Sequence, residues 1–582
     1  MRGGGGGRNV SRAVSQQAKA GQGRGRRGAR WLTAACATAP RLQCAWCIGD
    51  REGSLRRHIE EQDSAYETIG IAGFYGLAIA YQGVSDPHAR PLLPAGRKPT
   101  HRIEERPAAS AAGWAFRRRW MAKLGFTGHV GSRTLVRGSA ASMTGVAQTV
   151  PLLLDLFAPR RAERMRAGLA RTALRPPKTR LSAFVAAETA ETAETAGHST
   201  DDSLPTGYDV EEAADILAGV LHDAGVHDFA PLFIALGHGS TSMNNPHEAA
   251  HECGACSGGK GGANARLFAA LANDPRVRAA LAERGMEIPG RTVFVGGIHD
   301  TSSDAVTLFD LDAVPDSHTE LLAEAQGALL HARALDAHER VRRFDSVPLG
   351  VSPQAALRHV EGRAYNLAEP RPEYGHCTNA ICLVGRRWLS RGLFLDRRAF
   401  LVSYDPTRDP EGDVLARVLR SVGPVGAGIN LEYYFSTVDQ NVYGCGTKLP
   451  HNVNGLVGVM NGHESDLRTG LPYQMVDVHE PVRLVTVVEA TPARLLEIAE
   501  REPAVGRLVK GAWIQLVAAD PESGALFEFG PDGFTPYTPD LSRVSTYSDS
   551  RACYEAHRED RRPARILAGL PETVRSKESS HA

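Results

Sequence analysis

Three short apolar runs, each followed at once by glycine or polar residues, constrain the fold of this chain more than any other feature. They occupy residues 42–48, 228–236 and 291–298, and the second ends in Gly237-His238. Short continuous apolar runs of this kind are typical of fully buried strands. Between the first two runs, Val210–Ala224 has its apolar residues at helical spacing. The order of strand, polar loop and helix predicts an α/β fold with a mostly parallel sheet.

Composition divides the chain into four parts. An Arg/Gly-rich start without hydrophobic periodicity is typical of disorder, and a Glu-Thr-Ala repeat is typical of a flexible surface insertion. Later, strand-like and helical stretches alternate less regularly. We therefore expect a disordered segment at 1–40, an α/β domain at 41–400 with a flexible insertion near 187–206, a C-terminal α+β lobe at 401–560, and a polar tail at 561–582.

Charge and cysteine content exclude several classes of partner. The chain has 67 basic and 66 acidic residues, a net charge of +1, which predicts neither nucleic acid nor an acidic membrane surface as a partner. No apolar run approaches the roughly 18 residues that span a bilayer, so we expect no transmembrane segment of its own. Nine cysteines, an odd number, without a secretory leader indicate a reducing, cytoplasmic location.

The ends of the predicted strands carry candidate metal ligands. Cys47 lies at the end of the first run, His238 follows the second, and Cys253 comes from the loop beyond it. Ligands collect at the carboxyl ends of parallel strands, and thiolate and imidazole are the usual protein ligands of zinc. A catalytic zinc takes three protein ligands and keeps one position open. We therefore expect Cys47, His238 and Cys253 to form a catalytic zinc site, with His299 and Asp300 as candidates to line the same cleft.

The loop after the second strand offers two alternatives. His247, His251, Cys253 and Cys256 have the spacing of a compact structural zinc knuckle, with the two histidines at i,i+4. Cys253 and Cys256 also form a C-x-x-C pair, which is a modest signal for redox chemistry. Spacing alone does not decide between these alternatives and the three-segment site.

Several long motifs, which occur in one order along the chain, resemble the DabA family of probable inorganic carbon transporter subunits. They are Cys47-Ile-Gly-Asp-Arg-Glu-Gly-Ser-Leu-Arg-Arg-His-Ile-Glu, Tyr66-Glu-Thr-Ile-Gly-Ile-Ala-Gly-Phe-Tyr-Gly, Gly237-His-Gly-Ser-Thr-Ser-Met-Asn-Asn-Pro-His with Cys253-Gly-Ala-Cys256 behind it, Tyr443-Gly-Cys-Gly-Thr-Lys-Leu-Pro-His-Asn-Val and Ser465-Asp-Leu-Arg-Thr-Gly-Leu-Pro.

The resemblance implies a zinc site like that of β-type carbonic anhydrases, with Cys, Asp, His and Cys as ligands. Carried over by position, these ligands fall on Cys47, Gly49, His238 and Cys253, which favours Cys253 over Cys256. The resemblance also implies a fold similar to β-type carbonic anhydrase and a role in an energy-coupled uptake pump for CO2 or bicarbonate. In that reading the zinc would make a water molecule acidic enough to hydrate CO2. The partner would be a proton-channel-like membrane subunit, DabB, which would hold this chain peripherally at the cytoplasmic side of the cell membrane.

The chain departs from the family pattern in two ways. Gly49 stands where the pattern has aspartate, so that Arg51 loses its usual carboxylate partner. Asp50, the next residue, is the candidate substitute if a tight turn follows the strand, since on a strand it would face the opposite side, and we assign Arg51 and Asp50 as the catalytic pair. Only 46 residues precede Cys47, where the family carries several hundred, and this implies an N-terminal truncation. An alternative function is therefore an inactive or scaffold-like truncated paralogue without a competent zinc site. A third is a soluble hydrolase or redox enzyme that uses Cys253 and Cys256.

Overall fold

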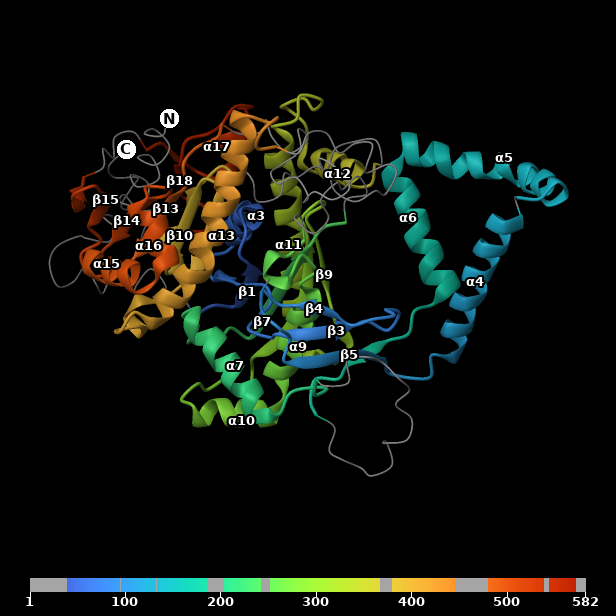
Figure 1. The fold of residues 1–582 in the computed structure, drawn as a ribbon, viewed down its shortest axis with the longest axis horizontal. Helices are drawn as coiled ribbons and strands as arrows, with labels where there is room; N and C mark the ends of the chain where they lie inside the picture. Colours follow the sequence, from blue (N-terminus) through green and yellow to red (C-terminus); the bar gives the residue numbers. More distant parts are fainter. Residues whose placement is uncertain are drawn as a thin grey trace.

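The computed structural model describes residues 39–571, apart from residues 95, 132, 186–203, 242–251, 367–378, 445–479 and 539–543. Most of the expected disordered start and flexible insertion, and half of the expected polar tail, lie outside the described residues. Within them the chain folds into a mixed α/β structure with four sheets (Figure 1).

The first sheet has five strands in the order β2-β1-β7-β8-β9. Its first four strands pair in parallel and the last is antiparallel. The strand predicted at 42–48 is confirmed, whereas those predicted at 228–236 and 291–298 each begin and end a few residues later. The bounds are β1 Leu42–Cys47, β2 Tyr66–Ile71, β7 Leu232–Gly239, β8 Val293–Asp300 and β9 Ala305–Leu308.

Helices cover both faces of this sheet, and β1 is buried along its whole length because alternate side chains pack on opposite faces. Cys44 and Trp46 pack with residues of α11 (Thr319–Val341), while Ala45 and Cys47 pack with residues of α9 (Gly262–Asn273). Two further helices, α7 (Val210–Asp223) and α10 (Pro275–Glu283), lie on the α9 side. The predicted helix 210–224 is therefore confirmed.

The second sheet has six strands in the order β12-β10-β13-β14-β15-β16, of which four pair in parallel and the last two are antiparallel. Its strands come from both sides of residue 400. Three helices, α13 (Asp413–Val438), α15 (Pro492–Arg501) and α16 (Pro503–Lys510), contribute to the core on one face. The strands are β10 Ile381–Gly385, β12 Ala399–Ser403, β13 Val485–Glu489, β14 Gln515–Ala519, β15 Leu526–Gly530 and β16 Gly533–Tyr537.

The two large sheets meet at their edge strands, β2 and β12, without forming a continuous ladder. The backbone N–H of Gly70 donates to Ser403 Oγ at 2.9 Å, and Arg56 Nη1 donates to the carbonyl oxygen of Leu401 at 2.9 Å. A Cβ at Gly70 would collide with the same carbonyl oxygen. Glycine is therefore required at this position for the two edges to lie so close.

Helix α3 (Asp50–Glu60) fills the junction between these sheets, and ten of its eleven residues are buried. The sequence here predicts a tight turn at Gly49-Asp50-Arg51 and then a helix with Ser54 as its N-cap, and this prediction is wrong. The helix begins at Asp50 with Gly49 as its N-cap, directly after β1. Asp50 and Glu52 lie in its first turn, where carboxylates interact favourably with the positive end of the helix dipole.

Two small sheets complete the described structure. One, in the order β4-β3-β5-β6, lies beside the first sheet, and the other, β11-β18-β17, lies beside the second. Their strands are β3 Ile79–Gln82, β4 Arg90–Leu92, β5 His101–Pro107, β6 Thr179–Leu181, β11 Leu393–Phe394, β17 Thr546–Tyr547 and β18 Ala564–Ile566.

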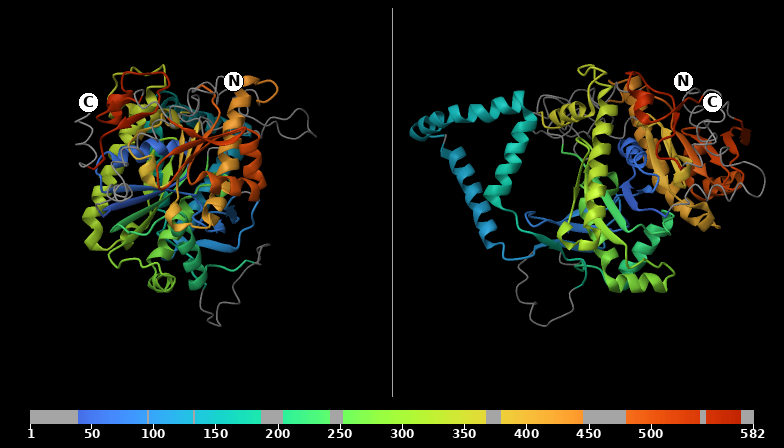
Figure 2. Two further views of the ribbon diagram at one scale, coloured as in Figure 1. Left: turned by 90° about the vertical axis from the view of Figure 1, so that its left-hand side faces the viewer. Right: turned by 180° about the vertical axis from the view of Figure 1, so that it is seen from behind.

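Between β5 and β6 the chain forms a projecting arm of three helices, α4 (Ala112–Gly131), α5 (Leu135–Phe157) and α6 (Pro159–Leu169). Figures 1 and 2 show the arm as an open triangular frame that extends away from the sheets. It touches the body again where α6 packs on α12 (Pro353–Ala364), through an ion pair of Arg160 with Glu361. We call residues 112–174 the arm.

Candidate metal site

The pairing of β1 with β7 brings two of the expected ligands to the same edge of the first sheet. The strands run in parallel with Trp46 opposite Leu236, so that Cys47 and His238 follow at the carboxyl ends of neighbouring strands. The third expected ligand, Cys253, lies in a tight turn, where its backbone N–H donates to the carbonyl oxygen of Gly259 at 3.0 Å and its own carbonyl oxygen accepts from the N–H of Gly258. The predicted edge of the sheet is therefore the place where the three segments meet.

Cys47, His238 and Cys253 form a buried group that could hold a metal ion. One ligand atom from each lies within 4.8 Å of the others, and the two Sγ atoms are 3.7 Å apart. All three residues are at most 4% exposed. Two thiols and one imidazole are a donor set that suits zinc, so the residues present fit the ion that the sequence motifs imply. In the part of the chain that the structure describes, this is the one group of its kind.

Gly73 allows the two thiols to approach each other. A Cβ at this position would lie 2.5 Å from Cys47 Sγ and 3.1 Å from Cys253 Sγ. The segment after β2 thus passes directly over the sulfur pair, with no room for a side chain. Gly73 belongs to the second of the long motifs, where sequence reasoning had given it no role.

Charged groups surround the imidazole of His238. Its Nδ1 lies 3.1 Å from Glu52 Oε1, and its Nε2 lies 3.2 Å from Arg51 Nη2. Burial lowers the pKa of His238, but the neighbouring Cys47 and Glu52 outweigh it and raise that pKa to about 10. Burial raises the pKa of Glu52, and here too the neighbours, His238 first, hold it well below its usual range. A carboxylate on Nδ1 is the arrangement that fixes the tautomer and orientation of metal-bound histidines.

The buried charges continue from Glu52 toward the interior. Nδ1 of His299 lies 3.8 Å from Glu52 Oε1, and its Nε2 lies 3.2 Å from Asp304 Oδ1, which also accepts a 2.9 Å hydrogen bond from Arg340. Burial lowers the pKa of His299, but Asp304 and Glu52 raise it to about 9. His299 therefore borders the site, as expected. Asp300 instead accepts hydrogen bonds from Thr241 and from the turn that follows β8.

Arg51 and Asp50, which we expected to act as the catalytic pair, are both buried, and their catalytic roles stay predictions. Arg51 lies at the site, where Nη1 donates to Thr301 Oγ1 at 3.0 Å beside its contact with His238. Asp50 is buried too, but it is not one of the residues whose ligand atoms converge. Burial lowers the pKa of Arg398, which lies just before β12, and the charge of Asp560, with a smaller contribution from Asp50, opposes that lowering.

The two alternatives in the loop after β7 are only partly described. His247 and His251 lie outside the described residues, so the knuckle remains a prediction. Cys256 is buried, with its Sγ 3.9 Å from Asn264 Oδ1, and it does not belong to the group formed by Cys47, His238 and Cys253.

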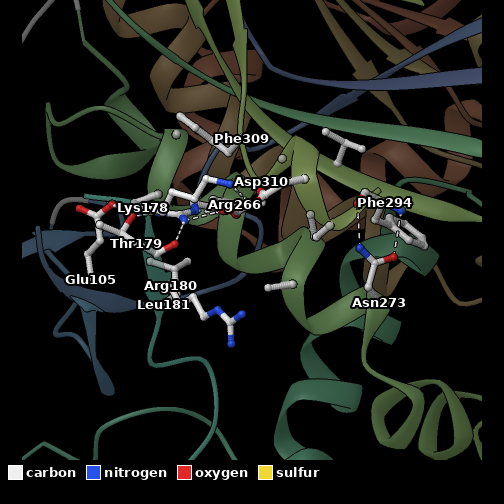
Figure 3. A pocket seen from close by; sticks show the side chains of 18 of the residues that line it. Glu105, Lys178, Thr179, Arg180, Leu181, Arg266, Asn273, Phe294, Phe309 and Asp310 are labelled. Atoms are coloured by element: carbon white, nitrogen blue, oxygen red, sulfur yellow. Dashed lines mark hydrogen bonds and ion pairs between the residues drawn. The ribbon is translucent and has the colours of Figure 1, made fainter. Parts of the chain in front are cut away.

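A separate cavity of about 820 Å³ lies against α9 and β8, and none of the three candidate ligands lines it (Figure 3). Several of its polar side chains already have partners. Arg266 forms ion pairs with Asp310 at 2.6 Å and with Glu105 at 2.9 Å, and Asn273 bonds both backbone groups of Phe294. The cavity is therefore not part of the metal site.

Glu52 and Gly73 are the main site residues that sequence reasoning missed. Glu52 lies five residues after Cys47 and on the same turn of α3 as Arg51, and this position was the one available signal for it. Gly73 gave no local signal, because its role depends on two cysteines that are distant in the sequence.

The fold and the site define the class of protein: it is a mixed α/β protein with a buried Cys-His-Cys group that could hold a metal ion. Residues 8–514 match the sequence model of the family described as "Probable inorganic carbon transporter subunit DabA". The matched residues include most of the segment 1–40.

Curated relatives agree with this match. The protein named "Probable inorganic carbon transporter subunit DabA 1" of Sorangium cellulosum (strain So ce56) is 50% identical over 512 residues, which cover 86% of this chain and 49% of the relative. "Probable inorganic carbon transporter subunit DabA" of Parafrankia sp. (strain EAN1pec) is 44% identical over 554 residues, with 92% and 50% covered. The corresponding protein of Methylococcus capsulatus (strain ATCC 33009 / NCIMB 11132 / Bath) is 44% identical over 552 residues, with the same coverage.

The chain belongs to the DabA family. It spans about half the length of the curated relatives that it matches. Among the described residues, no helix combines the length and the apolar character that crossing a bilayer requires.

Proposed function

We propose that this chain is a zinc-binding subunit of an energy-coupled uptake system for inorganic carbon, acting with a DabB-type membrane subunit. CO2 or bicarbonate would be its substrate, and the partner would hold it peripherally on the cytoplasmic side of the cell membrane. The convergence of Cys47, His238 and Cys253 in one buried group is the observation that carries the proposal. The family match supports inorganic carbon as the substrate, rather than another substrate of a thiolate-bound metal ion.

Each residue of the site has a role in this proposal. Cys47 and Cys253 would hold the ion as thiolates, and His238 would complete the set through one ring nitrogen while Glu52 orients the ring through the other. A bound zinc ion would supply the Lewis acidity that makes a water molecule reactive toward CO2 near neutral pH. Arg51 keeps a positive charge beside the site, which favours an anionic species such as bicarbonate there.

The scaffold-like alternative also has a specific observation in its favour. Gly49 replaces the aspartate that the family pattern implies, and the converging group has three members, without Asp50. A subunit that keeps the fold and the partner surface but binds metal poorly would have these features.

Metal analysis of purified variants tests the proposal. We expect about one zinc per chain in the native protein after dialysis, and loss of that zinc in Cys47→Ser and Cys253→Ser, because each removes one of three ligands. Cys256→Ser and Cys382→Ser are matched controls, since both remove a buried thiol outside the group, and they should keep their zinc. Circular dichroism confirms that each variant is folded.

Two outcomes would contradict this assignment. Zinc that depends on Cys256 but not on Cys47 would favour the local knuckle or the redox pair. The second outcome comes from an uptake assay with labelled bicarbonate, in cells that lack carbonic anhydrase and express the chain together with a DabB-type subunit. If zinc is retained as proposed but no uptake occurs, the scaffold-like alternative is favoured.

A further inference from the structure

The arm exposes more bulky apolar surface than any other part of the described structure. Phe116, Trp120 and Phe126 of α4 are 69%, 54% and 69% exposed, and Phe157 at the end of α5 is 82% exposed. Exposed patches of this extent on a folded protein mark interaction sites. The other bulky apolar side chains exposed on the arm are Met121, Leu124, Val130, Leu135, Val150, Leu152, Leu153, Leu156, Met165 and Leu169.

The arm is also strongly basic. Residues 112–174 contain eleven arginine or lysine residues and two acidic residues, whereas the whole chain is almost neutral. Arg119 and Lys123 are exposed and lie one helical turn apart on α4, the helix that carries Phe116 and Trp120. The overall balance of charge therefore hides a local excess of positive charge. Our expectation that no acidic membrane surface is a partner was drawn from that overall balance and does not apply to the arm.

We propose that the arm binds the surface of an anionic phospholipid bilayer. Exposed aromatic and leucine side chains would enter the interfacial region, and the arginine and lysine side chains would contact the negatively charged headgroups. Tryptophan is enriched at this depth of a membrane, which agrees with the exposure of Trp120. This contact is additional to the contact with a membrane subunit, and it does not depend on the metal site.

Charge favours lipid over a protein partner. Surface-bound amphipathic segments combine apolar side chains with clustered arginine and lysine, and the excess of basic over acidic residues in the arm is complementary to anionic headgroups. Helices α4 and α6 have this composition, whereas α5 is mainly apolar with Arg137 as its one basic residue. Bulky apolar side chains of all three helices are exposed, and Figure 2 shows the three helices as an open frame.

Vesicle co-sedimentation of the full chain tests the proposal. We expect binding to vesicles that contain phosphatidylglycerol, weaker binding as salt is raised, and little binding to pure phosphatidylcholine vesicles. The double variant Arg119→Ala/Lys123→Ala should bind less tightly, by on the order of fivefold for each charge removed. Trp120→Ser/Phe126→Ser should lose most of the binding to anionic vesicles.

Matched variants outside the arm serve as controls. Trp513→Ser removes a tryptophan of similar exposure, and Arg507→Ala/Lys510→Ala removes two exposed charges from α16. Both should bind vesicles as the native chain does. Zinc content should be unchanged in the arm variants, so a failure of this proposal is distinguishable from a failure of the metal site.

Three results would overturn the proposal. One is the absence of binding to anionic vesicles by a folded native chain. Another is equal loss of binding in the control variants. The third is that Trp120→Ser/Phe126→Ser abolishes a stable dimer, or a complex with the membrane subunit in uncharged detergent, but leaves vesicle binding unaffected. The arm would then be a protein interface.

Discussion

Gly49 lies at the carboxyl end of β1, two residues after Cys47, and its backbone can accept the aspartate of the family pattern. Its φ of −169° and ψ of 157° are extended values that any residue adopts. It is also the N-cap of α3 and makes no side-chain capping bond, whereas aspartate is among the preferred N-cap residues. Nothing in the local conformation therefore requires glycine.

We predict that Gly49→Asp retains zinc more strongly than the native chain. A carboxylate at this position would return the fourth ligand that the family pattern implies, with a gain of at least the roughly 10-fold that outer partners of a site contribute. Competition with a chelator followed by metal analysis measures the difference. Gly49→Asn is the matched control, because it caps a helix equally well without an anionic oxygen. Equal retention in Gly49→Asp and the native chain would show that residue 49 does not reach the metal.

Gly73 leads to a second prediction at this scale. Gly73→Ala places a methyl group against both sulfur atoms, so we expect the thiols to separate and zinc retention to fall. Gly219→Ala is the control, because Gly219 is exposed on α7 with open space around its Cα and alanine favours the helix by up to about 1 kcal/mol. Unchanged zinc affinity in a folded Gly73→Ala protein would mean that the sulfur pair is held apart from this segment.

At the scale of elements, sequence patterns predicted the strands and helices whose periodicity is regular. β1 and α7 were predicted because one is a continuous apolar run and the other has a clear apolar face. The start of α3 was not, because a helix buried on all sides by ion pairs has no amphipathic pattern to read. Cys47, His238 and Cys253 were predictable from strand ends and motifs, whereas Glu52 and Gly73 depend on tertiary contacts between distant segments.

The link between α3, α11 and the turn before β12 gives an element-scale prediction. Asp336 of α11 is buried, and it accepts hydrogen bonds from Ser54 and, at 2.6 Å, from Arg397. Asp336→Asn would leave the largely buried Arg397 guanidinium without its ion-pair partner, and removing one partner of a buried pair costs up to about 3–5 kcal/mol. Chemical denaturation measures the loss in the free energy of unfolding.

The control and the pH dependence sharpen this prediction. Asp274→Asn breaks an exposed pair with Arg276 and should cost about 1 kcal/mol or less from that pair. Burial raises the pKa of Asp336, but Arg397 and Arg340 outweigh it and lower that pKa below its usual range. The stability from this carboxylate is therefore present above about pH 4 and is lost as the pH falls below it. Asp336→Asn should lack this part of the acid sensitivity, and an unaltered pH profile would contradict the assignment.

At the scale of the whole molecule, the two large sheets could be anticipated from the order of apolar runs, but their junction could not. Their edge strands meet through Gly70 and Ser403, residues more than 300 positions apart, and no local pattern marks such a contact. The arm escaped prediction for a different reason. The net charge of the whole chain is close to zero and hides the positive charge of the arm. Apolar residues on a helix do not show from sequence alone whether they are buried or exposed.

The burial of α3 has a mechanical consequence. This helix begins three residues after Cys47 and packs against α11 on one side and β12 of the second sheet on the other. Because almost all of its residues are buried, the helix cannot move into solvent when the second sheet is displaced. The displacement would instead move the whole of α3, which is about 16 Å long at 1.5 Å per residue, and with it the nearby Cys47. A shift of the second sheet would therefore change the position of Cys47.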